Sequence, residues 1–497
     1  MRPLRLLSLV LVVGAASLGG EVATARLLAP WFGDSTLIWA NTIATVLLSL
    51  SVGYWLGGRL ADRSPTPARL SALVLAASCL FAAVPFAARP FLRSTVSAFE
   101  LLSVGAFVGS LIAVLALVAV PMLLLGTVAP FALRLAITRI EDAGAVSGRL
   151  YAVSTLGSLG GVFLSALLLI PFVGTRRTFL AFAVLLALVA VVSLGLRWLF
   201  APVAIAGLFL IPVGTVKAAG EGRILWERET PYEYARVVES LDGERRLELD
   251  EGLAVHSVYR PGAWLTGRYW DEPLVAPFAI GAAAPRSAAL LGDGAGTTAR
   301  AFGHFFPAMR VDAVELDGAL HDVGRRLFDL HGPHLHLHVS DARVFLRASE
   351  RRWDAIVIDV YRQPYIPFHL ATAEFFALAR DHLTSHGVVL MNVAHPLGSD
   401  ALERALSATI GTAFAHVMRD PVSLYNTVLV ASDARISSAR LRRASAAMPP
   451  ALRPLAVKAG ARLTSALPGG PVFSDDRAPV EWLIDASIVE AVAEGVD

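Results

Sequence analysis

Residues Ser287 to Gly296 read Ser-Ala-Ala-Leu-Leu-Gly-Asp-Gly-Ala-Gly, and the helix-forming segment Thr297 to Phe305 follows them. A short apolar run therefore leads into a glycine turn and then into a predicted helix. Glycines let the backbone approach a ligand, and the helix N-terminus offers free N–H groups at the same place. This order predicts a strand, a ligand-binding turn and a helix, which together begin an α/β domain.

Acidic residues end the next three predicted strands. Glu315 follows the strand 311–314, about twenty residues past the turn, where an acid can accept hydrogen bonds from two ribose hydroxyls. Asp341 and Asp359 follow the next two strands. The carboxyl ends of parallel strands line the crevice in which open α/β sheets bind ligands. The turn and three acids in register predict a nucleoside site, and the Gly-x-Gly-x-Gly spacing favours an S-adenosylmethionine-type nucleoside over a dinucleotide.

The remainder of the chain is unusually apolar. Of its 497 residues 55% are apolar and only 17% are charged, and the mean hydropathy is +0.60. The apolar residues gather in the first 216 positions, in blocks long enough, or nearly so, to cross about 30 Å of hydrocarbon as helices. We therefore predict a polytopic α-helical membrane domain over residues 1–216. Its blocks are Leu4–Ala29, Leu37–Leu56, Leu70–Ala88, Leu101–Ile137, Leu150–Pro171, Thr178–Leu196 and Phe200–Val216.

Arginines in the loops after the second and fourth blocks orient these helices, because the positive-inside rule puts both loops in the cytoplasm. Seven spans would leave the C-terminal part outside, away from any nucleoside. Two alternatives return it to the cytoplasm. The block 200–216 lies at the interface, or the block 101–137 breaks at Pro121 into two crossings. We predict a multi-pass protein of the cell membrane with six to eight spans and a cytoplasmic C-terminal domain.

Beyond residue 217 the sequence is typical of a soluble protein. Short alternating runs over 217–285 predict a small β-strand subdomain. Strands alternating with helices over 286–497 predict a Rossmann-like α/β domain of the S-adenosylmethionine-dependent methyltransferase type. The net charge of +2 argues against a nucleic-acid partner. The single cysteine, Cys79, excludes disulfides and a cysteine metal cluster, and we expect no metal.

The motifs of this soluble part resemble those of spermidine synthases, the polyamine aminopropyltransferases. The membrane half is similar to the branch of that family in which a transporter-like domain is fused to the synthase, through the segments 21–30 and 148–158. The resemblance spans nearly the whole chain. The motifs that carry it in the soluble part are Leu291-Gly292-Asp293-Gly294-Ala295-Gly296-Thr297-Thr298-Ala299-Arg300, Val314-Glu315-Leu316-Asp317, the segment from Asp359 to Leu370, and the segment from Asp475 to Glu481.

The resemblance implies S-adenosylmethionine or its decarboxylated form as co-substrate. Glu315 would then hold the ribose, Asp341 the adenine amino group, and Asp359 would be the catalytic acid that orients and deprotonates the attacking amine. The partners implied are the lipid bilayer and small nucleoside and amine substrates, while the oligomeric state stays open, a homodimer being one alternative. The remaining cofactor-binding candidates are Gly292, Asp293, Gly294, Gly296 and Ala342. The substrate-binding candidates are Tyr234, Tyr269, Asp271, Tyr361, Arg362, His369 and Asp476.

One departure from the family leaves the acceptor open. Soluble spermidine synthases have Asp-Ser-Ser-Asp where this chain has Asp359-Val360-Tyr361-Arg362, so an arginine replaces the second acid. An arginine there disfavours putrescine and suits an anionic acceptor, or the carboxylate of S-adenosylmethionine itself. The predicted function is aminopropyl transfer to a polyamine such as putrescine. Two alternatives remain: methyl transfer or another attack on the sulfonium, and a non-catalytic membrane sensor or transporter-like protein.

Overall fold

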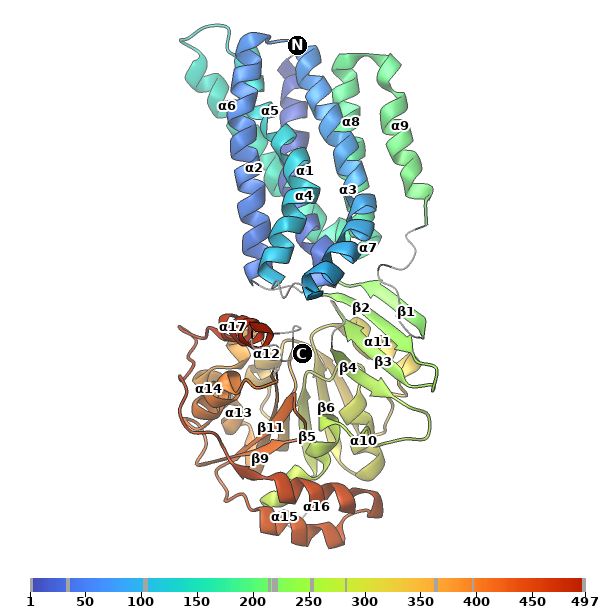
Figure 1. Ribbon diagram of the computed structural model, residues 1–497, viewed down its shortest axis with the longest axis vertical. Helices are drawn as coiled ribbons and strands as arrows, with labels where there is room; N and C mark the ends of the chain where they lie inside the picture. The colour runs from blue at the N-terminus through green and yellow to red at the C-terminus, as the bar shows by residue number, and fades with distance from the viewer. Residues whose placement is uncertain are drawn as a thin grey trace. The chain divides into compact units, whose positions relative to one another are not determined.

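The computed structural model describes residues 3–32, 36–101, 106–212, 216, 222–250, 254–281, 284–361, 365–395 and 397–493. The chain forms two compact units (Figure 1). The first comprises Met1–Ala218 and Arg228–Tyr234, and the second comprises Ala219–Glu227 and Ala235–Asp497. The domain boundaries expected after residues 216 and 285 stay predictions.

The described residues of the first unit's long apolar blocks are mostly helical. Within the described part of the chain, six helical stretches are long and apolar enough to cross a membrane. This composition is that of a multi-pass membrane protein. The helices are α1 (Pro3–Phe32), α2 (Thr36–Arg63), α3 (Pro67–Leu101), α4 (Ala106–Gly126), α5 (Val128–Ala136), α6 (Ala143–Phe163), α7 (Ile170–Val173), α8 (Thr175–Leu194) and α9 (Phe200–Gly207).

Two of the expected blocks differ from their predicted form. The described part of the last block contains α9 and the short turn Leu208–Leu210, which belong to one apolar helical stretch, Leu196–Leu210, that is shorter than the roughly 20 residues a span requires. Pro121 lies inside α4, and α4 and α5 form one stretch, Val108–Ala136, rather than two crossings. The break predicted at Pro121 is therefore wrong, and the described residues contain six candidate spans, the lower end of the predicted range.

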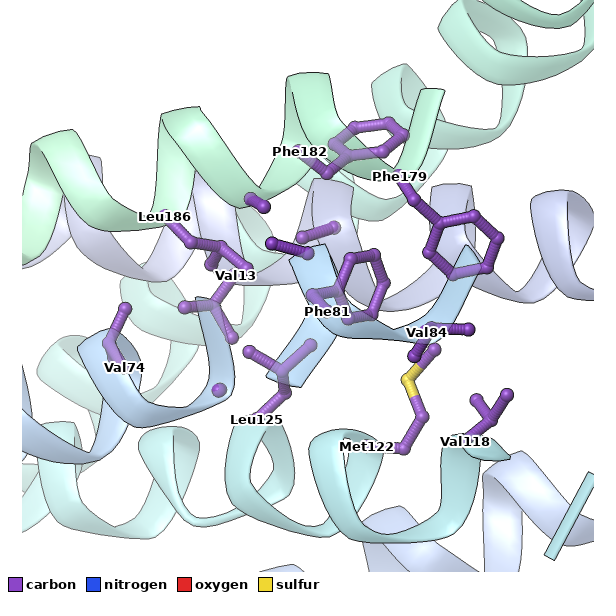
Figure 2. Packing of buried hydrophobic residues seen from close by; sticks show 14 of the residues in the cluster. Val13, Val74, Phe81, Val84, Val118, Met122, Leu125, Phe179, Phe182 and Leu186 are labelled. Carbon is purple, nitrogen blue, oxygen red and sulfur yellow. The ribbon is translucent and has the colours of Figure 1, made fainter. Parts of the chain in front are cut away.

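Aromatic and small residues pack the core of this unit (Figure 2). Phe81 of α3 and Phe179 of α8 are fully buried, with ring centroids 5.1 Å apart. A Cβ at Gly20 of α1 would lie 2.2 Å from the ring of Phe81, so the glycine lets α1 and α3 approach closely. Close packing of this kind replaces the hydrophobic driving force that lipid does not supply between helices.

The second unit contains an eight-stranded sheet in the order β12-β10-β11-β9-β8-β5-β6-β7. Strands β7, β6, β5, β8 and β9 run parallel, and the remaining strands pair antiparallel. Because β5 lies between β6 and β8, the strand order reverses at β5. The carboxyl ends of β5 and β8 therefore border the topological switch point where such sheets bind ligands. The strands are β5 (Ser287–Leu291), β6 (Arg310–Glu315), β7 (Leu335–Val339), β8 (Trp353–Ile358), β9 (Leu383–Ala394), β10 (His416–Pro421), β11 (Asn426–Ser432) and β12 (Thr464–Ser465).

Alternating residues of the parallel strands feed two cores. Ala289 and Leu291 of β5 pack on one face with α12, α13, α14 and α17, whereas Ala288 and Leu290 pack on the other with α10, α15 and α16. Figure 1 shows α13 and α14 on the opposite side of the sheet from α10. The helices are α10 (Thr297–Phe305), α11 (Gly318–Leu327), α12 (Ala342–Ala348), α13 (Ala373–Asp381), α14 (Ala401–Ile410), α15 (Ser438–Ala444), α16 (Arg453–Arg462) and α17 (Val480–Ala493).

A second, four-stranded sheet precedes this domain. It has the order β1-β2-β3-β4, and Leu247 on β3 packs in one cluster with Ala295 of the glycine turn and Leu320 of α11. The small sheet therefore adjoins the ligand-binding turn of the α/β domain. Together with the helical unit, this arrangement confirms the predicted fold class. The strands are β1 (Arg223–Glu229), β2 (Tyr234–Glu239), β3 (Arg245–Leu249) and β4 (Val255–Tyr259).

Candidate active site

The turn after β5 requires glycine at its first position. Gly292 has φ +82°, in the left-handed region that favours glycine, and a Cβ there would lie 2.3 Å from the carbonyl oxygen of Asp359. Asp359 N–H in turn donates to the carbonyl of Leu291 at 2.8 Å. The glycine turn and the end of β8 are thus in direct backbone contact. Gly294 (φ +57°) and Gly296 (φ +92°), the N-cap of α10, complete the turn.

Glu315 holds the glycine turn from the end of β6. Its Oε2 accepts from Gly294 N–H at 2.9 Å, and its Oε1 accepts from Asp317 N–H at 3.1 Å. Burial raises the pKa of Glu315, while these backbone hydrogen bonds oppose the rise. The carboxylate is therefore fixed beside the turn, with the geometry of a group that can accept further hydrogen bonds from ribose hydroxyls.

Asp341 follows Ser340, whose N–H donates a hydrogen bond to the carbonyl of Glu315 at the end of β6, at 3.0 Å. This hydrogen bond holds Asp341 near the end of β6. The Oδ1 atom of Asp341 caps α12, whose first residue is Ala342. Its Oδ2 lies 3.0 Å from Nε2 of His369. The hydrogen bond from His369 lowers the pKa of Asp341 and is the largest cause of that shift. The structure thus brings the two predicted residues Asp341 and His369 together.

Asp359 is the most strongly perturbed of the three acids. Burial raises its pKa to about 6, and hydrogen bonds from Asn392, Tyr269 and Trp270 oppose that rise. The Nδ2 of Asn392 donates to Oδ1 of Asp359 at 2.8 Å, and Asn426 Nδ2 donates to Oδ1 of Asn392 at 3.0 Å. A carboxylate whose pKa approaches neutrality can accept a proton more readily than an ordinary aspartate, as a general base must.

Tyrosines surround this carboxylate. The pKa of Tyr269 is raised, first by burial and then by the negative charge of Asp359, so the phenol stays protonated and donates. The hydroxyl of Tyr361 donates to the Asn392 carbonyl at 3.2 Å and accepts from Ala394 N–H at 2.6 Å. Both predicted tyrosines are therefore neutral hydrogen-bonding groups next to the acid.

A cavity of about 490 Å³ opens beside this cluster. Asp359 itself lines a small adjoining pocket of about 10 Å³, and Tyr269, Trp270 and Asn392 border both spaces. The acid therefore lies behind the wall of the larger cavity. The described residues that line the larger cavity are Ala254, Val255, His256, Gly267, Arg268, Tyr269, Trp270, Tyr361, Asn392, Ala394, His395, Val422, Ser423, Tyr425, Asn426 and Ile484.

Besides His369, three predicted substrate contacts lie outside both pockets, and a further one is not described. Tyr234 is buried at the start of β2, and Asp271 is buried and accepts from the N–H groups of residues 266 and 267. Asp476 is exposed. None of these three is among the described residues that line either pocket. Arg362 lies outside the described residues.

Asp475, rather than Asp476, is the anchored acid of its motif. Its carboxylate accepts two hydrogen bonds from Arg343, at 2.7 and 2.6 Å, and one from Thr372 at 2.8 Å. The hydrogen bonds from Arg343 lower the pKa of Asp475 to about 2. This acid ties the loop before α17 to α12 and α13, which is a structural role, while the neighbouring Asp476 projects into solvent.

Sequence reasoning missed Asn392 and undervalued His256. Asn392 is the one polar residue in the apolar run Val388–Val393 of β9, a signal that could have revealed it. His256 on β4 lines the cavity, and burial lowers its pKa to about 4, although a single histidine on a predicted strand is more often a packing residue. The remaining predicted turn residue, Asp293, is buried 3.6 Å from Nε2 of His321.

The histidines that alternate along β7 have protein partners. Nε2 of His338 lies 2.9 Å from Asp312, and Nε2 of His336 lies 2.9 Å from Arg310. Among the described residues, no group of three or more His, Cys, Asp or Glu side chains has an arrangement that could hold a metal ion.

Comparison with known proteins gives the following matches. No family model matches the chain. A probable polyamine aminopropyl transferase from Bifidobacterium longum is 33% identical over 197 residues, which cover 39% of this chain and 43% of that protein. The polyamine aminopropyltransferase of Vibrio vulnificus is 27% identical over 181 residues, which cover 35% of this chain and 60% of that protein. The chain thus spans about half the length of these relatives.

Among solved structures, a probable spermidine synthase from Corynebacterium glutamicum aligns with 50% of this chain and 97% of its own, with 22% identity and a TM-score of 0.40. The sequence relationship lies in the soluble part, beyond the six apolar helices. The C-terminal part of this chain is therefore homologous to the polyamine aminopropyltransferases.

Proposed function

We propose that this chain is a membrane-anchored transferase that moves an aminopropyl group from decarboxylated S-adenosylmethionine to an amine. A polyamine such as putrescine is the acceptor that the homology suggests. The single observation that carries the proposal is Asp359. It is a half-buried carboxylate with a pKa of about 6, at the carboxyl end of β8, in contact with the glycine turn and lining a small pocket that adjoins the larger cavity.

The donor would lie across the switch point of the sheet. The N-terminus of α10 follows the glycine turn at this point, Glu315 would accept from the ribose hydroxyls, and Asp341 from the adenine amino group. In that case the adenine amino group would compete with His369 for Oδ2 of Asp341. These assignments rest on the homology and on the positions of the side chains at the strand ends.

The transfer itself needs only one proton acceptor. The nitrogen lone pair of the amine attacks the carbon attached to the sulfonium, the carbon–sulfur bond breaks, and its electron pair returns to sulfur, giving methylthioadenosine. A free amine has a pKa of about 10 and is protonated at neutral pH, so it must first lose a proton. Asp359 would accept that proton and release it to solvent, while Asn392 and the hydroxyl of Tyr269 keep its carboxylate oriented.

The membrane unit would anchor this chemistry at the bilayer. We propose that the α/β unit is cytoplasmic, because sulfonium nucleosides and amines are made there. The six apolar stretches support membrane residence by their length and composition.

The test is a titration of the detergent-purified chain with S-adenosylmethionine and, separately, with its decarboxylated form, followed by assay of methylthioadenosine release in the presence of amines. We expect the decarboxylated form to bind more tightly and release to depend on the amine. Asp359→Asn should abolish turnover while nucleoside binding persists. Glu315→Ala should weaken nucleoside binding by roughly tenfold. Binding of the carboxylated form alone, or turnover by Asp359→Asn, would refute the proposal.

A further inference from the structure

We infer that the acceptor is a monoamine with a bulky, largely aromatic body that carries no second positive charge, rather than a short diamine. This inference rests on the proposed function, since it concerns the substrate that would meet Asp359. It follows from the size, the aromatic lining and the charge of the cavity that adjoins this acid.

The cavity is large for a linear four-carbon diamine. Its volume of about 490 Å³ lies in the range of roughly 300–1,000 Å³ typical of pockets that hold drug-sized ligands. A short diamine would leave most of that space to water and would bury little of the apolar wall. Because burial of apolar surface contributes most of the binding free energy of such ligands, a bulkier body fits the space better.

Aromatic side chains contribute to the wall of the cavity. The aromatic lining residues are Tyr269, Trp270, Tyr361 and Tyr425. The rings of Tyr269 and Trp270 have centroids 4.5 Å apart, and both residues line the small pocket that contains Asp359. Tyr425 lies in the turn just before β11 and is half exposed. An aromatic ligand body could stack on these rings while its amine points toward the acid.

The charge of the wall disfavours a second ammonium. An aromatic wall can also attract cations, but here the guanidinium of Arg268 already lies 5.9 Å from the Trp270 ring. Its partner Glu244 accepts from Arg268 at 3.1 Å and is therefore engaged. No acidic side chain is among the lining residues that the structure describes. Among these described residues, a distal ammonium would meet a guanidinium without a matching carboxylate.

Beside Arg268, the wall presents neutral hydrogen-bonding groups. Asn392 and Asn426 present amides, and burial lowers the pKa of His256 to about 4, so its imidazole is uncharged at neutral pH. In the described part of the chain, Nε2 of His256 is buried without a hydrogen-bond partner. A buried polar atom of this kind normally has a partner. A neutral hydroxyl on the ligand body would supply one, which makes a phenolic amine the natural probe.

Three amines separate these features. Butylamine differs from putrescine only in lacking the second ammonium, and tyramine adds a phenol ring and a hydroxyl. With the full-length protein in detergent and decarboxylated S-adenosylmethionine as donor, we expect kcat/KM for methylthioadenosine release to follow tyramine > butylamine ≥ putrescine. Tyramine should exceed butylamine by about tenfold, the value of one buried ring. A kcat/KM for putrescine about tenfold above that for butylamine would overturn the inference and leave the proposed function standing.

Two variants test the wall directly. Tyr425→Ala removes a half-exposed ring that does not contact the acid, and it should raise KM for tyramine about fivefold while KM for butylamine changes less than about twofold. Arg268→Gln removes the guanidinium beside the Trp270 ring, while Glu244 keeps its second partner Arg260 at 3.5 Å, so the variant should raise the putrescine-to-butylamine ratio of kcat/KM about fivefold. An unchanged selectivity in both variants would refute the assignment of this cavity to the acceptor.

A binding measurement separates the inference from the proposed function. Thermal shift with each amine in the absence of donor reports on the cavity alone. If no amine yields methylthioadenosine but tyramine still stabilises the protein more than putrescine does, the proposed transfer fails and the ligand class of the cavity stands. Stabilisation by putrescine alone would overturn the ligand class.

Discussion

Burial raises the pKa of Asp359 and the hydrogen bond from Asn392 opposes that rise, so replacing Asn392 should move the pH dependence of turnover. In Asn392→Leu the hydrogen bond at 2.8 Å to the carboxylate is lost while the side-chain volume is nearly kept. A hydrogen bond to a charged group contributes about 1.5–3 kcal/mol, and one pH unit corresponds to about 1.4 kcal/mol. The acidic limb of kcat/KM, expected near the pKa of about 6 in the wild type, should therefore rise by about one to two pH units.

The direction of the shift in the pH dependence follows from which form of Asp359 reacts. The carboxylate form of Asp359 accepts the proton, so activity falls as pH drops through its pKa, and a higher pKa moves that fall to higher pH. Turnover by Asn392→Leu should be about two- to tenfold lower at pH 7 and should recover at pH 9. The assay is methylthioadenosine release across pH 5 to 9, as kcat/KM for the amine. Simple loss of packing would lower activity equally at every pH.

A graded control comes from the next residue in the chain of amides. Asn426 donates to Oδ1 of Asn392 and so orients the amide whose Nδ2 faces Asp359. Asn426→Ala should shift the limb in the same direction but by less. If Asn392→Leu leaves the limb where the wild type has it, Asp359 is not the group that titrates, and the assignment of the base is refuted.

Three further predictions concern stability, each measured by chemical or thermal unfolding. Gly292→Ala should lower the free energy of unfolding by at least about 2 kcal/mol, because Gly292 has a φ of +82° and an added Cβ would lie 2.3 Å from a backbone oxygen. The control Gly303→Ala should be neutral or stabilising, because a Cβ at Gly303 would meet no atom within 4 Å. Asp475→Asn should lower the free energy of unfolding by about 1–2 kcal/mol at pH 7, and the wild type should lose this contribution as pH falls toward about 2. As a control, Asp476→Asn at the exposed neighbouring position should change the free energy of unfolding by less than about 0.5 kcal/mol. Burial and a neighbouring carboxylate raise the pKa of Glu272 above its ordinary 4.5, so the folded chain retains a proton that the unfolded chain releases. The free energy of unfolding should therefore fall as pH rises from about 5. Glu272→Gln should flatten this dependence of stability on pH. Equal effects of Gly292→Ala and Gly303→Ala, or of Asp475→Asn and Asp476→Asn, would contradict the argument for that position. A dependence of stability on pH that is the same in Glu272→Gln and in the wild type would contradict the argument for Glu272.

The turn and the three acids could be predicted because each follows from local sequence. Period-two and continuous apolar runs predict the strands, glycines mark the turn, and a residue at the carboxyl end of a parallel strand must lie at the same edge of the sheet as its counterparts. The contact between the turn and Asp359 through Gly292 is a direct consequence of β5 and β8 being neighbours. The apolar length of the blocks likewise predicts membrane helices, although the described part of the block 200–216 contributes only to the short helical stretch Leu196–Leu210.

Residues that act on the site from distant segments could not be predicted in this way. Tyr234 is aromatic and on a predicted strand, yet it is buried rather than part of the cavity wall. Asp475 and Asp476 are adjacent and chemically identical, and only the position of Arg343 decides which one is anchored. Asn392 is one polar residue in a buried strand, and its role depends on β9 lying next to β8.

The sequence by itself determined the two-part organisation, the glycine turn between strand and helix, and the identity of the acids at the strand ends, since hydropathy, glycine spacing and strand periodicity are local properties. Only the tertiary structure decided the proton affinity of Asp359, the wall of the cavity and its charge. These depend on burial and on hydrogen bonds between side chains far apart in the chain, such as Tyr269, Asn392 and Asn426. Desolvation and orientation act through space, and no window of sequence contains them.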